Sequence, residues 1–220
     1  MGSYKKGILG PFRGLVGTVI GSSWLGRKYM RSVPDSVRNP KSTAQQLVRA
    51  RFSILATLAA RLQQACMMGF KQLAASMQNT TRAVFMSKNW DATSAVSPRE
   101  VVVDYSKLKI SSGSTPNVIF GRADFGEQTH LTITVPFGEN DGDPNRTSAN
   151  DQVYLVAYGP DIDAVAVSTP AARSSRRATL VLPDEWDGTS VQLYGFTIGN
   201  AAYNMDRASD TAYLGHAEIQ

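Results

Sequence analysis

The sequence predicts an α+β protein in which a glycine-rich β-hairpin and a long helix precede an antiparallel, immunoglobulin-like β-sandwich. Three observations lead to this prediction. Glycine recurs between β-branched and aromatic residues near the start, one apolar stripe with helical spacing follows, and short strand-like runs fill the rest. The expected parts are a basic hairpin segment over residues 1–40, a helical segment over 41–90 and a β-sandwich domain over 99–220.

The hairpin is expected within residues 7–33, where glycine punctuates apolar side chains. Such a composition is typical of short strands that turn tightly or pack backbone against backbone. Residues 16–22 and 24–31 would pair around a turn at Leu25-Gly26. An isolated hairpin is marginally stable in water, so this segment is expected to pack on another surface, either of the same chain or of a neighbouring subunit.

The helical segment begins after a polar linker that Pro34 and Pro40 bracket. Ser42, followed three residues later by Gln45, matches a capping box at a helix N-terminus. Apolar residues then recur at spacings of three and four: Val48, Phe52, Leu55, Ala59, Leu62, Cys66, Phe70, Leu73 and Met77. This period predicts a helix, broken at most near Gly69. The stripe could pack on its own domain or against another subunit, and the sequence favours neither.

The β-sandwich is expected after a second helical piece at 81–88 and a linker at 91–98. Strand-like runs lie at 101–105, 107–111, 117–123, 130–135, 152–158, 164–168, 178–182, 191–198 and 212–219. Turn signals such as Asp187-Gly188 separate these runs, and no helical period interrupts them. This spacing indicates an antiparallel sandwich of immunoglobulin-like or fibronectin-like type. The Cys–Trp–Cys pattern of true immunoglobulin domains is absent, because Cys66 is the single cysteine.

Charge divides the chain into unlike halves. Residues 1–95 contain 14 Lys and Arg against two acids, a net charge of +12, whereas residues 96–220 contain 9 against 16, a net charge of −7. Such asymmetry favours contact between the basic half and nucleic acid, or head-to-tail association of unlike faces. The alternative is that both halves are ordinary solvated surfaces.

Two sets of candidate residues follow from these patterns. The assembly set combines hairpin positions with the centre of the helical stripe: Leu15, Gly17, Val19, Gly21, Trp24, Tyr29, Leu55 and Leu62. Gly17 and Gly21 are expected where backbones come too close for a side chain. The cationic set would contact nucleic acid or an acidic protein: Lys5, Lys6, Arg13, Arg27, Lys28 and Arg31.

Signals of catalysis are lacking, so we expect no enzymatic activity, cofactor, metal or small-molecule substrate. His130 and His216 have no local motif partner for a catalytic triad. The segment 21–28 lacks the lysine that a phosphate loop needs directly after its second glycine. The segment 141–152 lacks the sixth-place glycine and the final acid of a calcium loop.

Membrane and export signals are equally weak. The apolar run after Lys5 and Lys6 is broken at Pro11, which argues against a signal peptide. No run of about 18 apolar residues occurs, so no membrane span is expected. The protein is therefore expected to remain in the cytoplasm unless it leaves inside a particle.

Several motifs in sequence order resemble a known family. They are KGILGPFRGLVGTVIG at 6–21, YMRS at 29–32, NPKSTAQQ at 39–46, DYSK at 104–107, LVAY at 155–158, LVLP at 180–183 and YLG at 213–215. The chain is identified by them as a member of an uncharacterised domain-of-unknown-function family (number 6266) of Bacteroidota and their phages. It departs from the family pattern in Arg13 and Leu15, where many members have Ser and Lys, and it matches poorly over 78–98.

The resemblance carries no catalytic residue, since the family has no enzymatic assignment. Its members are similar to structural proteins of crAss-like gut phages, which build rings in the neck and tail. It therefore implies a virion structural protein that forms a homo-oligomeric ring, contacts other virion proteins and assembles in the cytoplasm of the bacterial host. The alternatives are a nucleic-acid-binding protein that uses the basic N-terminal half, or a bacterial protein-interaction module.

Overall fold

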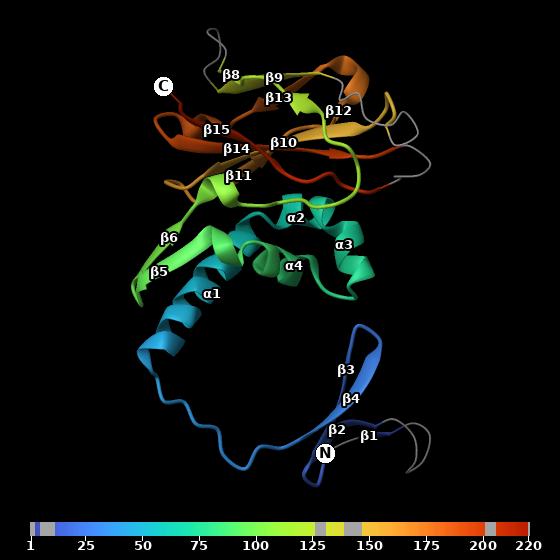
Figure 1. Cartoon of the computed structure of the whole chain (residues 1–220), viewed down its shortest axis with the longest axis vertical. Helices are drawn as coiled ribbons and strands as arrows, with labels where there is room; N and C mark the ends of the chain where they lie inside the picture. Colours follow the sequence, from blue (N-terminus) through green and yellow to red (C-terminus); the bar gives the residue numbers. More distant parts are fainter. Residues whose placement is uncertain (1–2, 5–11, 126–130, 139–146, 201–205, 220) are drawn as a thin grey trace. The chain divides into compact units, whose positions relative to one another are not determined.

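A computed structural model describes residues 3–4, 12–125, 131–138, 147–200 and 206–219 (Figure 1). The chain forms two compact units, Met1–Ser42 and Thr43–Gln220, which we call the arm and the body. The predicted α+β class is confirmed, because a few helices combine with several antiparallel sheets.

The arm is an antiparallel sheet with the strand order β1-β2-β3-β4. Its strands are β1 (Ser3–Tyr4), β2 (Phe12–Val16), β3 (Val19–Trp24) and β4 (Arg27–Ser32). β3 and β4 pair from Val19 opposite Ser32 to Trp24 opposite Arg27, with Leu25-Gly26 between them. The predicted strand over 16–22 is instead interrupted by a turn at Gly17-Thr18, which separates β2 from β3.

The body begins with a helical layer. Its helices are α1 (Thr43–Arg61), α2 (Gln63–Gly69), α3 (Lys71–Ser76), α4 (Thr81–Lys88) and the 3-10 turn η1 (Trp90–Ala92). The predicted continuous helix is therefore broken after Arg61 as well as at Gly69. Thr80 caps α4, since its hydroxyl accepts a hydrogen bond from the Ala83 amide at 3.2 Å.

Three antiparallel sheets follow. The small one pairs β5 (Thr93–Ser97) with β6 (Glu100–Val103). The outer sheet comprises β7 (Ile119–Phe120), β8 (Asp124–Phe125), β9 (Thr132–Gly138) and β13 (Arg177–Val181). The central sheet comprises β10 (Gln152–Gly159), β11 (Ala164–Val167), β12 (Ala171–Ala172), β14 (Ser190–Ile198) and β15 (Ala212–Glu218). Short 3-10 turns lie between them: η2 (Tyr105–Lys107), η3 (Arg173–Ser175) and η4 (Asp184–Trp186).

The central sheet is covered on both faces, by the outer sheet on one side and by the helices on the other (Figure 1). Along β10, Val153, Leu155 and Ala157 pack toward the outer sheet, whereas Val156 and Tyr158 pack toward the helices. This burial explains why β10 and β14 read as nearly unbroken apolar runs. The helices and the central sheet thus share one hydrophobic core, and the central and outer sheets enclose a second.

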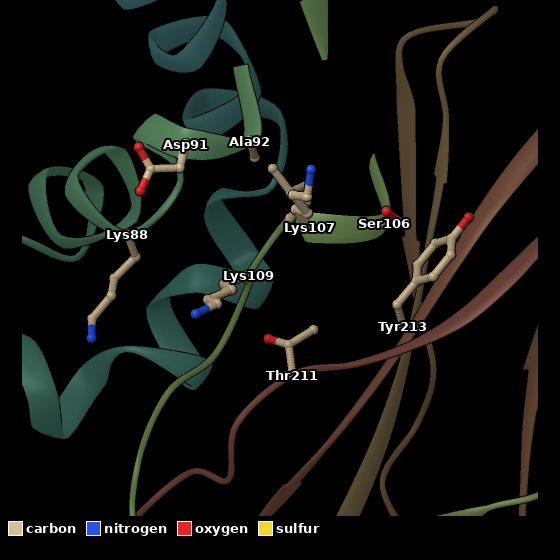
Figure 2. Close-up of a pocket in the computed structure, with 9 residues that line it drawn as sticks. Lys88, Asp91, Ala92, Ser106, Lys107, Lys109, Thr211 and Tyr213 are labelled. Carbon is tan, nitrogen blue, oxygen red and sulfur yellow. The ribbon is translucent and has the colours of Figure 1, made fainter. Parts of the chain in front are cut away.

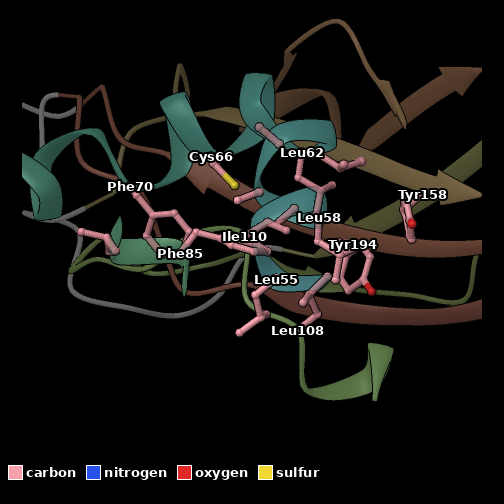
Figure 3. Close-up of a cluster of buried hydrophobic side chains, with 14 of the residues drawn as sticks. Leu55, Leu58, Leu62, Cys66, Phe70, Phe85, Leu108, Ile110, Tyr158 and Tyr194 are labelled. Carbon is pink, nitrogen blue, oxygen red and sulfur yellow. The ribbon is translucent and has the colours of Figure 1, made fainter. Parts of the chain in front are cut away.

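The predicted linker at 91–98 and the separate domain at 99–220 are corrected by this arrangement. Residues 93–97 form β5, which packs against α1. The core between helices and central sheet joins residues on both sides of the supposed boundary (Figure 3). Arg61 and Asp163 add an ion pair of 2.8 Å between the end of α1 and the β10–β11 connection. The body is consequently one unit from Thr43 onward.

Candidate functional site

The arm has a sheet but no core of its own. Of its described residues from 12 to 42, only Gly21 is buried. Large apolar side chains remain in solvent, including Trp24 at 54% and Met30 at 70% exposure. The strands are paired through their backbones while these side chains stay in water. Covering them would be favourable by about 25 cal/mol for each Å² of apolar surface buried. This exposed sheet is the strongest candidate for a binding surface.

The strand register divides the candidate residues between two faces of the arm, because directly paired residues lie on the same face of a sheet. The arginine–aromatic face contains Arg13, Leu15, Ile20, Trp24, Arg27, Tyr29 and Arg31. The glycine face contains Phe12, Gly14, Val16, Val19, Gly21, Lys28 and Met30. The assembly set and the cationic set are thus interleaved rather than separate, since arginines and aromatic rings share one face.

Gly21 and Gly17 are glycines for different reasons. A Cβ on Gly21 would lie 2.5 Å from the Phe12 carbonyl oxygen and 2.8 Å from the Phe12 ring, so a close approach exists there within the arm itself. Gly17 has nothing within 4 Å of such a Cβ among the described residues, and its expected close approach to another subunit stays a prediction. Its φ of +58° gives a separate reason, because a left-handed backbone favours glycine at this turn.

Leu55 and Leu62 do not belong to an assembly surface. Both side chains are 0% exposed and lie in the core between the helices and the central sheet (Figure 3). That part of the prediction is corrected, because the apolar stripe finds its partner within the body. The start of the stripe extends beyond this core, and Val48 and Phe52 on α1 are 52% and 57% exposed.

A lysine pocket at one end of the helical layer was not predicted from the sequence (Figure 2). Its volume is about 290 Å³, and its lining comprises Lys88, Asp91, Ala92, Ser106, Lys107, Leu108, Lys109, Thr211 and Tyr213. These residues come from three distant segments, the end of α4 with η1, the η2 region and the start of β15. The only local signal was the DYSKLK run at 104–109.

The lysines of this pocket have different surroundings. Lys107 pairs with Asp104 at 2.8 Å, and hydrogen bonds from Lys107 and Ser106 lower the pKa of the Asp104 carboxyl to about 2. Within the described residues, neither Lys88 nor Lys109 has an ion-pair partner. Figure 2 shows the Lys109 amino group beside the Thr211 hydroxyl, with Lys88 on the opposite side of the pocket lining. The pocket therefore suits an anionic group.

Several predicted residues lie outside the described part of the chain, namely Lys5, Lys6, His130 and segment 141–146.

Among the residues that the structure describes, no group of three or more His, Cys, Asp and Glu could hold a metal ion. In the same residues, no helix combines the length and the apolarity needed to cross a bilayer. Burial raises the pKa of the Cys66 thiol to about 12.

No curated protein matches this chain. A family model matches residues 11–215, which include β2 to β4 of the arm and nearly all of the body. This match agrees with the family expected from the sequence motifs. The chain therefore belongs to the family of unknown function DUF6266.

Proposed function

We propose that this protein is a non-enzymatic structural subunit of a phage virion, and that its copies associate through the arm into a ring in the neck or tail. The main observation behind this proposal is that the paired strands of the arm leave apolar side chains exposed, whereas the body buries its own hydrophobic core. An element that folds its backbone without burying its side chains is suited to pack on a partner.

Resemblance supports the more specific parts of this proposal. The resemblance read from the sequence motifs implies relatives among Bacteroidota and their phages and a likeness to crAss-like ring proteins, and on that basis we favour a virion component assembled in the host cytoplasm. An immunoglobulin-like identity of the two-sheet sandwich is part of the same proposal. It is supported by the packing of the central and outer antiparallel sheets around a shared core.

The test compares the full chain with a truncation that lacks residues 1–33, by size-exclusion chromatography with light scattering. We expect a defined oligomer for the full chain and a monomer for the truncation, with the same cooperative melt of the body in both. Leu15→Ser should weaken the oligomer because it makes the arm less apolar. Val181→Ser is the matched control, since Val181 is 68% exposed on the outer sheet of the body. A truncated chain that keeps the full-length oligomer contradicts the proposal.

Nucleic-acid binding is the second candidate, because the arginine–aromatic face combines three arginines with Trp24 and Tyr29. Arginines can contact phosphates while aromatic rings stack on bases. Titration of a fluorescent single-stranded oligonucleotide separates the candidates. A nucleic-acid binder should lose affinity steeply with salt and upon Arg27→Gln or Arg31→Gln. Lys28→Gln tests whether the glycine face also takes part, because Lys28 belongs to the cationic set but lies on that face. Arg177→Gln, exposed on β13 of the body, is the control. Assembly through apolar packing should persist at high salt.

A further inference from the structure

An acidic corner lies at one end of the body. It is formed by Asp161, Asp184, Glu185 and Asp187, all exposed, with Glu218 at the end of the adjacent strand. Trp186 is only 2% exposed and anchors the turn η4 in the core between the two sheets. Asp161 accepts hydrogen bonds from the Ser190 amide and hydroxyl at 3.0 and 2.6 Å. Asp184 and Glu185 thus belong to a turn that Trp186 anchors, and Asp161 is held beside it by Ser190.

The lysine pocket belongs to a surface of opposite charge. Residues 43–90 of the helical layer contain six Lys and Arg and no acid. Lys88 at the end of α4 and Lys109 after η2 both line the pocket (Figure 2). The acids that face it are Asp91 in its lining and Asp104, which is bound to Lys107. Three lysines thus stand against two acids, which leaves a formal charge of +1 around the pocket.

The pocket and the corner lie at opposite ends of β15. The strand begins at Ala212, directly after Thr211 of the pocket, and ends at Glu218, which pairs with Ser190 beside Asp161. At about 3.3 Å per residue, roughly 20 Å separates the two patches. Both patches adjoin the same strand of one folded body, at its opposite ends, so they cannot meet within one copy. A contact between them is therefore heterologous, and repetition of such contacts produces a closed ring or a filament.

We propose that the lysine pocket of one copy receives the acidic corner of the next copy. This inference rests on the proposed ring function and assigns its second contact. The apolar arm supplies burial, whereas the pocket and the corner set the direction in which subunits follow one another, since complementary charges fix register and exclude wrong partners.

The test reverses charges in the full-length chain. One variant carries Lys88→Glu and Lys109→Glu, and the other carries Asp184→Lys and Glu185→Lys. Each variant alone places like charges at every contact, so self-association at low salt should weaken by roughly tenfold or more. In an equimolar mixture, every contact between unlike variants again pairs opposite charges. Sedimentation velocity should therefore show that association returns, in mixed oligomers in which the two variants alternate. Arg177→Glu on β13 and Asp124→Lys on β8 are controls that should leave association unchanged.

The outcomes separate this inference from the proposed function. If both reversals leave the oligomer intact while loss of residues 1–33 abolishes it, the charge contact is wrong and the arm-mediated assembly stands. A wild-type chain that remains monomeric overturns both. If a reversed variant does not melt cooperatively, the wild-type protein is used to test the contact instead. Isotope-labelled and unlabelled wild-type chains are mixed and cross-linked with a zero-length carbodiimide. Cross-links should join Lys88 or Lys109 of one isotopic form to Asp184 or Glu185 of the other, and cross-linked oligomers without them overturn the inference.

Discussion

The arm and the body are both built largely from antiparallel strands, yet they differ in what covers those strands. The central sheet of the body is packed between a second sheet and a helical layer, so that Leu155 and Tyr194 are 0% exposed. The arm has four paired strands and neither of these layers within its own unit, so that Met30 is 70% exposed. Strand number alone therefore does not make a stable unit, and the second layer does.

The body supplies stability from its own residues, whereas the proposed function assigns the uncovered apolar surface of the arm to another molecule. The predictions that follow challenge the comparison, in order of decreasing effect.

The largest effect is expected from removal of the helical layer. A fragment of residues 43–220 should melt as cooperatively as the full chain, because it retains the whole body. A fragment of residues 99–220 should lose cooperative unfolding, since the face of the central sheet that includes Tyr158 and Phe196 would be opened to water. Circular dichroism melts of the two purified fragments test this.

A cooperative transition in the shorter fragment would show that the sandwich is independent of the helices. It would then restore the boundary at 91–98 that the sequence suggested. If the 43–220 fragment does not unfold cooperatively, the body needs the arm for its stability. That result would contradict the distinction between a self-sufficient body and an uncovered arm.

The next effect separates the two parts of the apolar stripe on α1. Leu55→Ala and Leu62→Ala should each lower the free energy of unfolding by about 2–5 kcal/mol, because both side chains are fully buried. Val48→Ala and Phe52→Ala should change it by less than about 1 kcal/mol, since both are more than half exposed. Urea titrations of the four variants measure the difference. Equal losses at all four positions would mean that the core extends along the whole stripe.

The stripe also shows how far the sequence could predict the fold. Its period gave a helical segment from Ser42 onward, and Gly69 marked a real break. The period could not identify the partner of Leu55, because a buried stripe looks the same whether a sheet of the same chain or another subunit covers it. The answer was present in β10 and β14, whose apolar runs lack the alternation of a strand with one solvated face.

Two further differences between expectation and structure have physical reasons. Residues 93–97 looked like a linker because Ser, Thr and Ala are common in loops, but pairing with β6 makes them a strand. The lysine pocket could not be predicted, because Lys88, Lys109 and Thr211 meet only through tertiary packing. For the arm, the small size and apolar content predicted a segment without a core of its own, but they did not show whether the same chain or another subunit would cover it.

A smaller effect is expected within the arm. Gly21→Ala would force Phe12 away from β3, because the new Cβ would lie 2.5 Å from its carbonyl oxygen. We expect self-association to weaken by about 1–3 kcal/mol, a range typical of overpacking. Gly17→Ala is the matched comparison and should cost about 1 kcal/mol, since only its positive φ opposes a side chain. Sedimentation equilibrium measures association, and an unchanged body melt is the control. A stronger effect at Gly17 would contradict this assignment.

The smallest effect concerns the pH dependence of the body core. Burial raises the pKa of the Cys66 thiol from 9.0 to about 12. Between these values an unfolded chain releases the thiol proton while the folded chain keeps it. The stabilisation is therefore complete below pH 9 and is lost as the pH rises toward 12. From pH 9 to pH 10 this thiol should lower the free energy of unfolding by about 1 kcal/mol.

The Cys66→Ala variant lacks this thiol, so between pH 9 and pH 10 it should lose about 1 kcal/mol less stability than the wild type. The buried tyrosines are present in both proteins and therefore do not affect the difference. Guanidinium titrations at the two pH values measure the difference. Identical pH dependence in the two proteins would mean that the thiol is accessible to water, and the contrast between a dry core in the body and an uncovered arm would no longer hold at this position.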